Sequence, residues 1–256
     1  LGSHNDQEGG QEVEMTLALN PNSFEAHALA LDWAIEKYNF ERAQAELDTL
    51  KKISDAPRVS ALEGRLLLKQ RLPEQALGPL KSAVEGNPTD PEARGWLAGA
   101  YYLLCQNELA EGQIKALQAG EAGSKENPGG GLGGAHPVAL FQAGEILRDA
   151  RQFELAESMY QAAAQSATWW SEPYAALAQL YLETGQEEKA KLAYDKSFQI
   201  DPFNHRAYNQ LTLLDYLNNK EQFRLLETEH FIIRYDKRDA ILAQLASVQL
   251  ERIYPD

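Results

Sequence analysis

Apolar residues between positions 171 and 204 recur twice with the spacing of an amphipathic helix. The first set follows the i, i+3, i+7 rule and consists of Tyr174, Leu177 and Tyr181. The second set mixes small and large residues and consists of Ala190, Tyr194 and Ser197. Gly185 marks a turn between the two sets, and Pro202 stops the second helix because proline lacks a backbone donor. The segment therefore predicts two helices joined by a tight turn.

The same pattern recurs upstream at a nearly regular interval. The position of the small residue in each second helix shows it best: Ala43, Ala76, Ala110, Ala156 and Ala190. The interval from Ala110 to Ala156 is longer than the others because it contains one repeat and an insertion, which lies in the glycine-rich segment 123–136. Because that segment lacks GxxxxGK[ST], and lacks GxGxxG between a strand and a helix, it favours a flexible loop over a phosphate-binding loop.

This helix–turn–helix unit resembles the tetratricopeptide repeat. Small residues at repeat positions 8, 20 and 27 let the backbones approach, and large residues at positions 4, 7, 11 and 24 fill the space between helices. The resemblance implies an all-α fold, an α-α superhelix (a solenoid of antiparallel helix pairs), followed here by a short C-terminal strand plus helix. Two regions are expected up to residue 226. Residues 1–23 form a tag or flexible start and the tail of a preceding repeat, and residues 24–226 form the array. The array contains a loop at 125–136, a capping helix at 205–226 and these repeats: 24–56, 57–90, 91–124, 137–170 and 171–204.

The remaining segment, 227–256, changes character. The stretch ETEHFIIRYD alternates apolar and polar residues and predicts a half-buried strand with Phe231, Ile233 and Tyr235 on one face. No ladder partner for this strand is evident in the chain, and a lone strand is marginal by itself. An amphipathic helix follows at 238–254, with these expected apolar contacts: Ile241, Leu242, Leu245, Val248 and Ile253.

The segment from 226 to 256 resembles the opening strand and helix of the peptidase MA-like (gluzincin) domains, which follow tetratricopeptide arrays in many bacterial proteins. That family binds zinc and activates water through HExxH, and none of the five histidines here is followed by ExxH. The resemblance thus implies a domain truncated before its catalytic machinery. It assigns no catalytic or metal-binding role to any residue of this chain.

Charge and cysteine content narrow the classes of partner. The net charge of −14 repels phosphate backbones, so the sequence predicts no nucleic-acid binding. A single cysteine, Cys105, excludes an intrachain disulfide and a cysteine-based metal site. No run of about 18 apolar residues is present, so no membrane span is predicted. The first residues, LGSH, indicate an engineered or processed start, so a soluble protein is expected but its compartment, cytoplasmic or exported, is left open.

Candidate binding residues follow from the resemblance, because positions 2, 5, 9, 12 and 13 of the first helices line a concave groove in this repeat family. The candidate groove residues here are Arg58, Arg65, Lys69, Tyr102, Phe141, Arg148, Gln179, Asn209 and Tyr216. Arg58, Arg65 and Lys69 form a basic cluster in an acidic chain, which favours a partner with an acidic segment, with Tyr102 and Phe141 as apolar anchors. A solvated basic face is the alternative reading of the same cluster.

The sequence predicts a binding protein without catalytic residues, metal or cofactor. The first hypothesis is a protein–protein interaction scaffold that binds a peptide or protein segment in the groove. The alternative is the substrate-recruiting N-terminal arm of a zinc metallopeptidase whose catalytic domain lies beyond residue 256. Self-association through the C-terminal strand or the repeat ends is a third hypothesis. A structural role is favoured over a chemical one for His230, Cys105 and the pair Trp169–Trp170.

Overall fold

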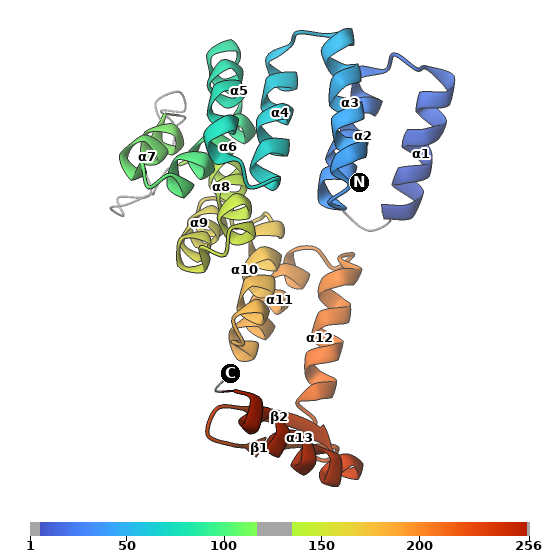
Figure 1. The fold of residues 1–256 in the computed structure, drawn as a ribbon, viewed down its shortest axis with the longest axis vertical. Helices are drawn as coiled ribbons and strands as arrows, with labels where there is room; N and C mark the ends of the chain where they lie inside the picture. The colour runs from blue at the N-terminus through green and yellow to red at the C-terminus, as the bar shows by residue number, and fades with distance from the viewer. Residues whose placement is uncertain (1–5, 117–134, 255–256) are drawn as a thin grey trace. The chain divides into compact units, whose positions relative to one another are not determined.

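The computed structural model of the protein describes residues 6–116 and 135–254, so most of the predicted loop at 125–136 lies outside the described residues. This part of the chain is mainly helical (Figure 1). Its helices up to residue 205 are α1 (Asp6–Leu19), α2 (Phe24–Glu36), α3 (Phe40–Ile53), α4 (Pro57–Lys69), α5 (Pro73–Gly86), α6 (Pro91–Leu103), α7 (Asn107–Lys115), α8 (Pro137–Asp149), α9 (Phe153–Ser166), α10 (Glu172–Glu183) and α11 (Glu187–Ile200).

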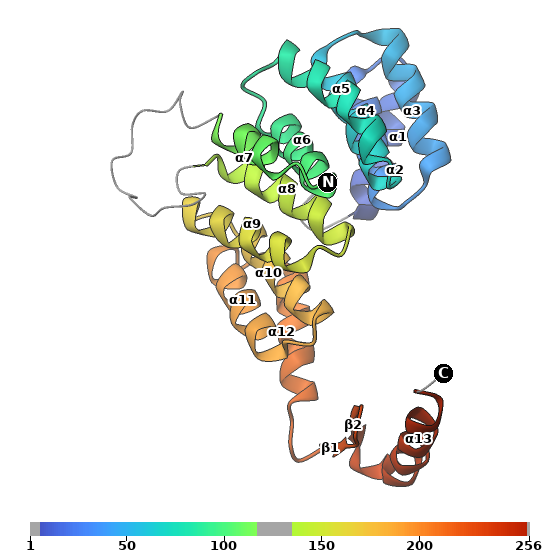
Figure 2. The same ribbon diagram turned by 60° about the vertical axis from the view of Figure 1, so that its left-hand side comes forward.

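These helices form the predicted pairs. The pairs that pack together are α2 with α3, α4 with α5, α6 with α7, α8 with α9, and α10 with α11, as Figure 2 also shows. Their starts follow from sequence: proline occupies the first turn of α4, α5, α6 and α8, where its missing donor costs nothing. Ser23 and Asp90 cap α2 and α6 by accepting hydrogen bonds from backbone N–H groups. The all-α solenoid predicted from the repeats is confirmed.

Each turn between paired helices has one residue in the left-handed region. These residues occupy repeat position 15 and are Tyr38, Arg71, Cys105, Arg151 and Gly185, with φ between 55° and 74°. In the turn at Gly185, the N–H of Gln186 donates to the carbonyl of Tyr181, which closes a helix-ending motif. Equivalent bonds close the other four turns. Only glycine adopts this conformation without a steric cost, so Gly185 suits the motif best.

Small residues let the helices approach where the repeat pattern expects them. All five alanines at repeat position 20 are fully buried. At position 8, a Cβ on Gly64 would lie 2.3 Å from Cγ of Leu80, and one on Gly144 would lie 2.7 Å from Cε1 of Tyr160. Buried leucines and tyrosines fill the remaining space and form one apolar cluster that extends from α2 to α11. The packing role predicted for the small positions is therefore confirmed.

A helix precedes the first repeat. The segment 1–23 was expected to be a flexible start followed by the end of a preceding helix. That helix is α1, which begins at Asp6 and packs against α2. Gly9 and Gly10 lie within it, and a Cβ on Gly10 would lie 3.4 Å from the ring of Trp33. Contact with the neighbouring helix outweighs the weak helix propensity of glycine here.

The structure divides into one part up to His205 and a second from Arg206, so the boundary precedes the predicted limit at 226. The second part consists of α12 (His205–Leu217), β1 (Phe223–Glu227), β2 (Ile232–Asp236), the 3₁₀ turn η2 (Lys237–Asp239) and α13 (Ala240–Ile253). The predicted capping helix at 205–226 thus ends at Leu217. Asn219 begins the turn, because its carbonyl accepts from Phe223 and its side chain accepts from Glu221.

The predicted strand exists, but the expectation that it lacks a partner was wrong. β1 pairs with β2 in an antiparallel hairpin, with Leu225 opposite Arg234 and Leu226 opposite Ile233. The partner was missed because FRLLE at 223–227 contains good helix formers and stands where a repeat would place its second helix. Pairing with β2 overrides that propensity, as tertiary context commonly does for short apolar segments.

Candidate functional site

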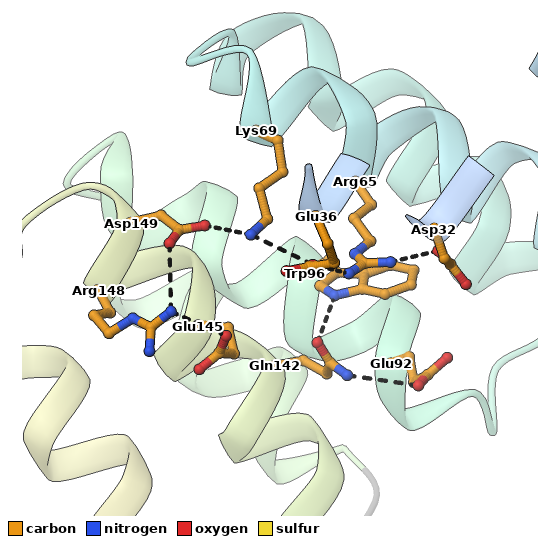
Figure 3. Close-up of polar contacts among 10 residues, drawn as sticks. All are labelled: Asp32, Glu36, Arg65, Lys69, Glu92, Trp96, Gln142, Glu145, Arg148 and Asp149. Carbon is orange, nitrogen blue, oxygen red and sulfur yellow. Dashed lines mark hydrogen bonds and ion pairs between the residues drawn. The ribbon is translucent and has the colours of Figure 1, made fainter. Parts of the chain in front are cut away.

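A pocket opens between the first helices of four successive repeats. Its volume is about 180 Å³, and its lining comes from α2, α4, α6 and α8: Glu36, Arg65, Lys69, Trp96, Phe141, Gln142, Glu145 and Ile146. Figure 3 shows the polar side chains of these helices converging on one region. A cavity of this size accommodates one side chain of a bound segment rather than a drug-sized molecule, for which pockets of roughly 300–1,000 Å³ are usual.

Ion pairs at equivalent repeat positions connect α2 to α4. At position 2, Arg58 Nη1 lies 2.8 Å from Glu25 Oε2. At position 9, Arg65 Nη1 pairs with Asp32, and its Nη2 lies 2.6 Å from Glu36 Oε1. In each pair the acid belongs to the first repeat and the base to the second, so the two helices carry complementary charges along their shared face.

Lys69 extends this network from α4 to α8. Its Nζ lies 2.6 Å from Asp149 Oδ2 and 3.6 Å from Glu36 Oε1 (Figure 3). Burial opposes the charge on Lys69, but Glu36 and Asp149 outweigh it and raise the pKa of the ammonium group above its ordinary value. Arg148 adds a second cation, with Nη2 at 3.5 Å from Glu145 and 3.8 Å from Asp149. These residues act as a staple between helices that are far apart in sequence.

Two glycines in α6 allow α8 to come close. A Cβ on Gly95 would lie 2.5 Å from the carbonyl oxygen of Ala139, and one on Gly99 would lie 2.9 Å from Cβ of Ile146. Such distances are below van der Waals contact, so larger residues would force the helices apart. Because α8 packs tightly on α6, it also contacts α4 directly, which brings Lys69 and Asp149 into reach.

Aromatic and amide groups form the apolar side of the pocket. Trp96 donates its indole N–H to Gln142 Oε1 at 2.9 Å, and the Arg65 guanidinium lies 5.4 Å from the Trp96 ring. Phe141 packs against Trp170, with ring centroids 5.0 Å apart. These contacts hold the aromatic side chains in place, which lowers the entropy cost of binding a segment against them.

Two carboxyl groups near the pocket, Asp32 and Glu92, have raised pKa values. Burial raises the pKa of Asp32, although Arg65 and Arg58 act in the opposite direction. Burial also raises the pKa of Glu92, and repulsion from Asp32 and Asp90 adds to it. Both carboxyl pKa values are therefore raised mainly because the groups are buried, and neighbouring acids add to this at Glu92.

Exposure decides which sign of charge a partner meets. The side chains of Arg65 and Lys69 are only 15% and 5% exposed, whereas that of Glu36, which pairs with both, is 52% exposed. The bases therefore lie beneath their acids. The basic cluster predicted from sequence exists in space, but each of its three members is paired with a carboxylate of this chain.

The other predicted groove residues fall into three groups. Phe141 and Arg148 lie at or beside the pocket, as the positional rule expects. Tyr102 is buried in the apolar cluster, and burial raises the pKa of its hydroxyl, so its ring is not a surface anchor. Gln179 is on α10, where it accepts from the hydroxyl of Tyr194 at 3.2 Å.

Asn209 and Tyr216 belong to α12, in the second part of the structure. Asn209 is exposed, and the ring of Tyr216 packs edge-on against Phe223 with a centroid separation of 5.2 Å. The hydroxyl of Tyr216 accepts from the side chain of Gln222 at 2.8 Å. Tyr216 thus supports the base of the hairpin, a role that its repeat position did not suggest.

Sequence reasoning missed several pocket residues. Glu36 and Asp149 stand at position 13 of their repeats, as Lys69 does, so the rule that selected Lys69 also selects them. Trp96 and Gln142 both occupy position 6, which the rule omits, and no sequence signal marked them. They reach the pocket because the glycines of α6 bring α8 unusually close.

The remaining sequence candidates lie outside the pocket. His230 hydrogen-bonds to Glu251 at 2.7 Å and stacks on Tyr254, and its bonds to Glu251 lower the pKa of that carboxyl group to about 2. Cys105 is exposed in the turn between α6 and α7. Within residues 6–116 and 135–254, no cluster of His, Cys, Asp and Glu is arranged to hold a metal ion. No described helix combines the length and the apolar character needed to cross a membrane.

Comparison with known proteins agrees with the repeat architecture. Residues 171–204 match the family model described as tetratricopeptide repeat. Similar solved structures include a thermophilic TPR protein, TTC0263, from Thermus thermophilus, with 19% identity over 75% of this chain and 100% of that one and a TM-score of 0.47. MamA from Desulfovibrio magneticus RS-1 is 21% identical over 78% of this chain and 97% of that one, with a TM-score of 0.38.

A third similar structure is YrrB, described as a TPR protein with an unusual peptide-binding site. It is 17% identical over 77% of this chain and 96% of that one, and its TM-score is 0.39. No curated protein sequence matches the chain.

Proposed function

We propose that this chain is an interaction scaffold that binds a peptide segment of a partner protein, because residues 171–204 match the tetratricopeptide repeat and the other helix pairs repeat the same architecture. The observation that supports the proposal is the pocket between α2, α4, α6 and α8. It combines preformed aromatic walls with charged side chains at its opening, which is the composition of a site for one anchoring side chain of a segment.

The partner segment proposed here is basic. An acidic segment would have to displace Glu25, Asp32 and Glu36 from the bases they neutralise, and each displaced carboxylate would remain close by. A lysine or arginine beside an apolar anchor needs no such displacement. It would approach the more exposed Glu36, which lies one turn from Asp32 on the same helix.

Two synthetic peptides test the charge preference. One alternates Leu and Phe with Lys and Arg, and the other has Glu at every basic position. We expect fluorescence anisotropy to show binding of the basic peptide only, weakened by added salt. Glu36→Gln should weaken binding by about threefold to tenfold, because it removes an exposed charge at the pocket.

The matched control is Glu41→Gln, on the second helix α3, which should leave the affinity unchanged. Equal affinity of the two peptides, or equal effects of the two substitutions, would refute the charged-pocket proposal. Preferential binding of the Glu peptide, lost in Arg58→Glu, would instead support the acidic segment that the sequence suggested.

A second candidate function is the recruiting arm of a zinc metallopeptidase. Its support is that the segment resembling peptidase MA-like domains does form a strand at β2 followed by a helix at α13. Reading the gene past the codon for Asp256 tests this candidate. An HExxH motif within about 100–200 residues, one domain's length, would support it, and an immediate stop codon would overturn it.

A further inference from the structure

Helix α13 packs with its small residues inward and its large residues outward. The residues buried on it are Ala243 and Ser247, which are one turn apart. The five large apolar side chains of α13 that the sequence predicted to make core contacts are instead 60–75% exposed, whereas Leu250 is half-buried: the exposed five are Ile241, Leu242, Leu245, Val248 and Ile253. This expectation was wrong because the hairpin is only two short strands wide and contacts one face of the helix.

The exposed face has the pattern of a helix–helix seam. Ile241, Leu245 and Val248 follow the i, i+4, i+7 spacing that places apolar residues in one stripe. Leu242 and Ile253 flank the stripe on one side. Monomeric proteins seldom leave a continuous apolar stripe of this kind exposed.

We propose that the outward face of α13 binds the same face of a second copy of this chain, in an antiparallel pair with two-fold symmetry. If the two-fold axis passes between Leu245 and Val248, Leu245 of each copy faces Val248 of the other. Ile241 then faces the aliphatic stem of Arg252, whose charged end extends to water. The stripe is thus complementary to itself, as an isologous interface requires.

Charge distribution favours a second copy at this place. The whole chain carries a net charge of −14, but residues 206–256 contain seven Lys and Arg against eight Asp and Glu, a net charge of −1. Within α13 the only charged residues are Glu251, which binds His230, and Arg252. The part of the chain that carries α13 is therefore almost neutral, so two copies that meet through this helix face little like-charge repulsion at the contact itself.

The area also fits. Burying one large aliphatic side chain removes roughly 60–120 Å² of apolar surface, so the three stripe residues on each copy give about 360–720 Å² in total, and full burial of the flanking Leu242 and Ile253 would extend this to about 1,200 Å². The upper part of this range reaches the threshold of about 1,000 Å² for a specific interface. The expected assembly is consequently a reversible dimer that dissociates on dilution, rather than an obligate one.

Sedimentation velocity of the whole chain, from about 1 µM to about 200 µM, tests the proposal. We expect a monomer–dimer equilibrium that Leu245→Glu weakens at least tenfold, because the substitution places two like charges at the axis. Leu192→Glu is the matched control, since Leu192 is 72% exposed on α11 and lies outside the proposed interface. Circular dichroism checks that both variants keep their helix content.

A second variant pair tests the geometry. In a Cys105→Ser background, a chain with both Leu245→Cys and Val248→Cys should form a disulfide-linked dimer under mild oxidation, because each position faces the other across the axis, whereas Leu192→Cys should not. A chain that stays monomeric at every concentration, or a dimer that Leu245→Glu leaves intact, would overturn the proposal. A third outcome would also overturn the proposal: a chain that stays monomeric and binds phosphatidylcholine vesicles, with that binding lost in Leu245→Glu but kept in Leu192→Glu. The exposed face of α13 would then bind a lipid surface rather than a second copy.

Discussion

The ion pair between Lys69 and Asp149 allows a quantitative test of the staple between α4 and α8. Lys69→Met removes the cation and leaves Asp149 in a mostly buried position, where the side chains of the pair are 5% and 17% exposed. Removing one partner of a buried pair typically costs about 3–5 kcal/mol. We expect about 3 kcal/mol, at the lower end, because Arg148 lies 3.8 Å from Asp149 and compensates in part.

A matched pair on the surface calibrates this figure. Lys115 and Glu111 are also 2.6 Å apart, but their side chains are 45% and 46% exposed. Lys115→Met should therefore cost only about 0.3–0.5 kcal/mol. For a domain of this size, 1 kcal/mol corresponds to about 2–4 °C in Tm. The Tm should therefore fall by about 6–12 °C in Lys69→Met and by less than about 2 °C in Lys115→Met.

The double-mutant cycle gives the decisive number. Asp149→Asn alone should also destabilise the protein, because Lys69 then keeps only Glu36 at 3.6 Å. The double variant, with Lys69→Met and Asp149→Asn, should lose about 1–3 kcal/mol less than the sum of the two single variants. Additive losses, within about 0.5 kcal/mol, would show that the two side chains do not interact and would refute the staple.

Two further predictions concern helix packing and pH. Gly95→Ala should destabilise the protein by about 1–2 kcal/mol in urea unfolding, because the added Cβ would strike Ala139. Gly112→Ala, whose Cβ would have nothing within 4 Å, should stabilise the protein by up to about 1 kcal/mol. Equal effects of the two substitutions would contradict the close approach of α6 and α8. Burial alone would lower the pKa of His27, but hydrogen bonds to Glu46 and the Pro21 carbonyl raise it. The native protein should therefore have a larger free energy of unfolding than His27→Gln, and this difference should be full below about pH 6.5 and decline as pH rises through the raised pKa. Urea unfolding near pH 6 and pH 8.5 measures the difference, and a difference that grew with pH would contradict the prediction.

The repeat array could be predicted because its helices depend on local signals. The i, i+3, i+7 spacing, the prolines at helix starts and the small residue at position 20 are all visible within the length of a single repeat. The hairpin was missed because β1 consists of residues with good helix propensity, and only its pairing with β2 makes it a strand. A long-range pairing of that kind has no signal inside the segment itself.

The pocket was predictable only in part, for a related reason. Repeat positions selected Arg65 and Lys69, which line the pocket, but they did not show that carboxylates of neighbouring helices pair with both. The bond from Lys69 to Asp149 crosses an intervening repeat, and it depends on how far the glycines of α6 let α8 approach. Helix separation is set by packing across three repeats, which one repeat's pattern does not contain.

The indole N–H resonance of Trp96 tests most directly whether the pocket is the binding site. This group donates to Gln142 at the pocket wall, so a side chain that enters must change its surroundings. During titration with the basic peptide, we predict that the Trp96 signal, assigned with Trp96→Phe, shifts to saturation. The signal of Trp169, which is 76% exposed and does not line the pocket, should stay in place. A saturable shift of Trp169 with no change at Trp96 would contradict binding in the pocket.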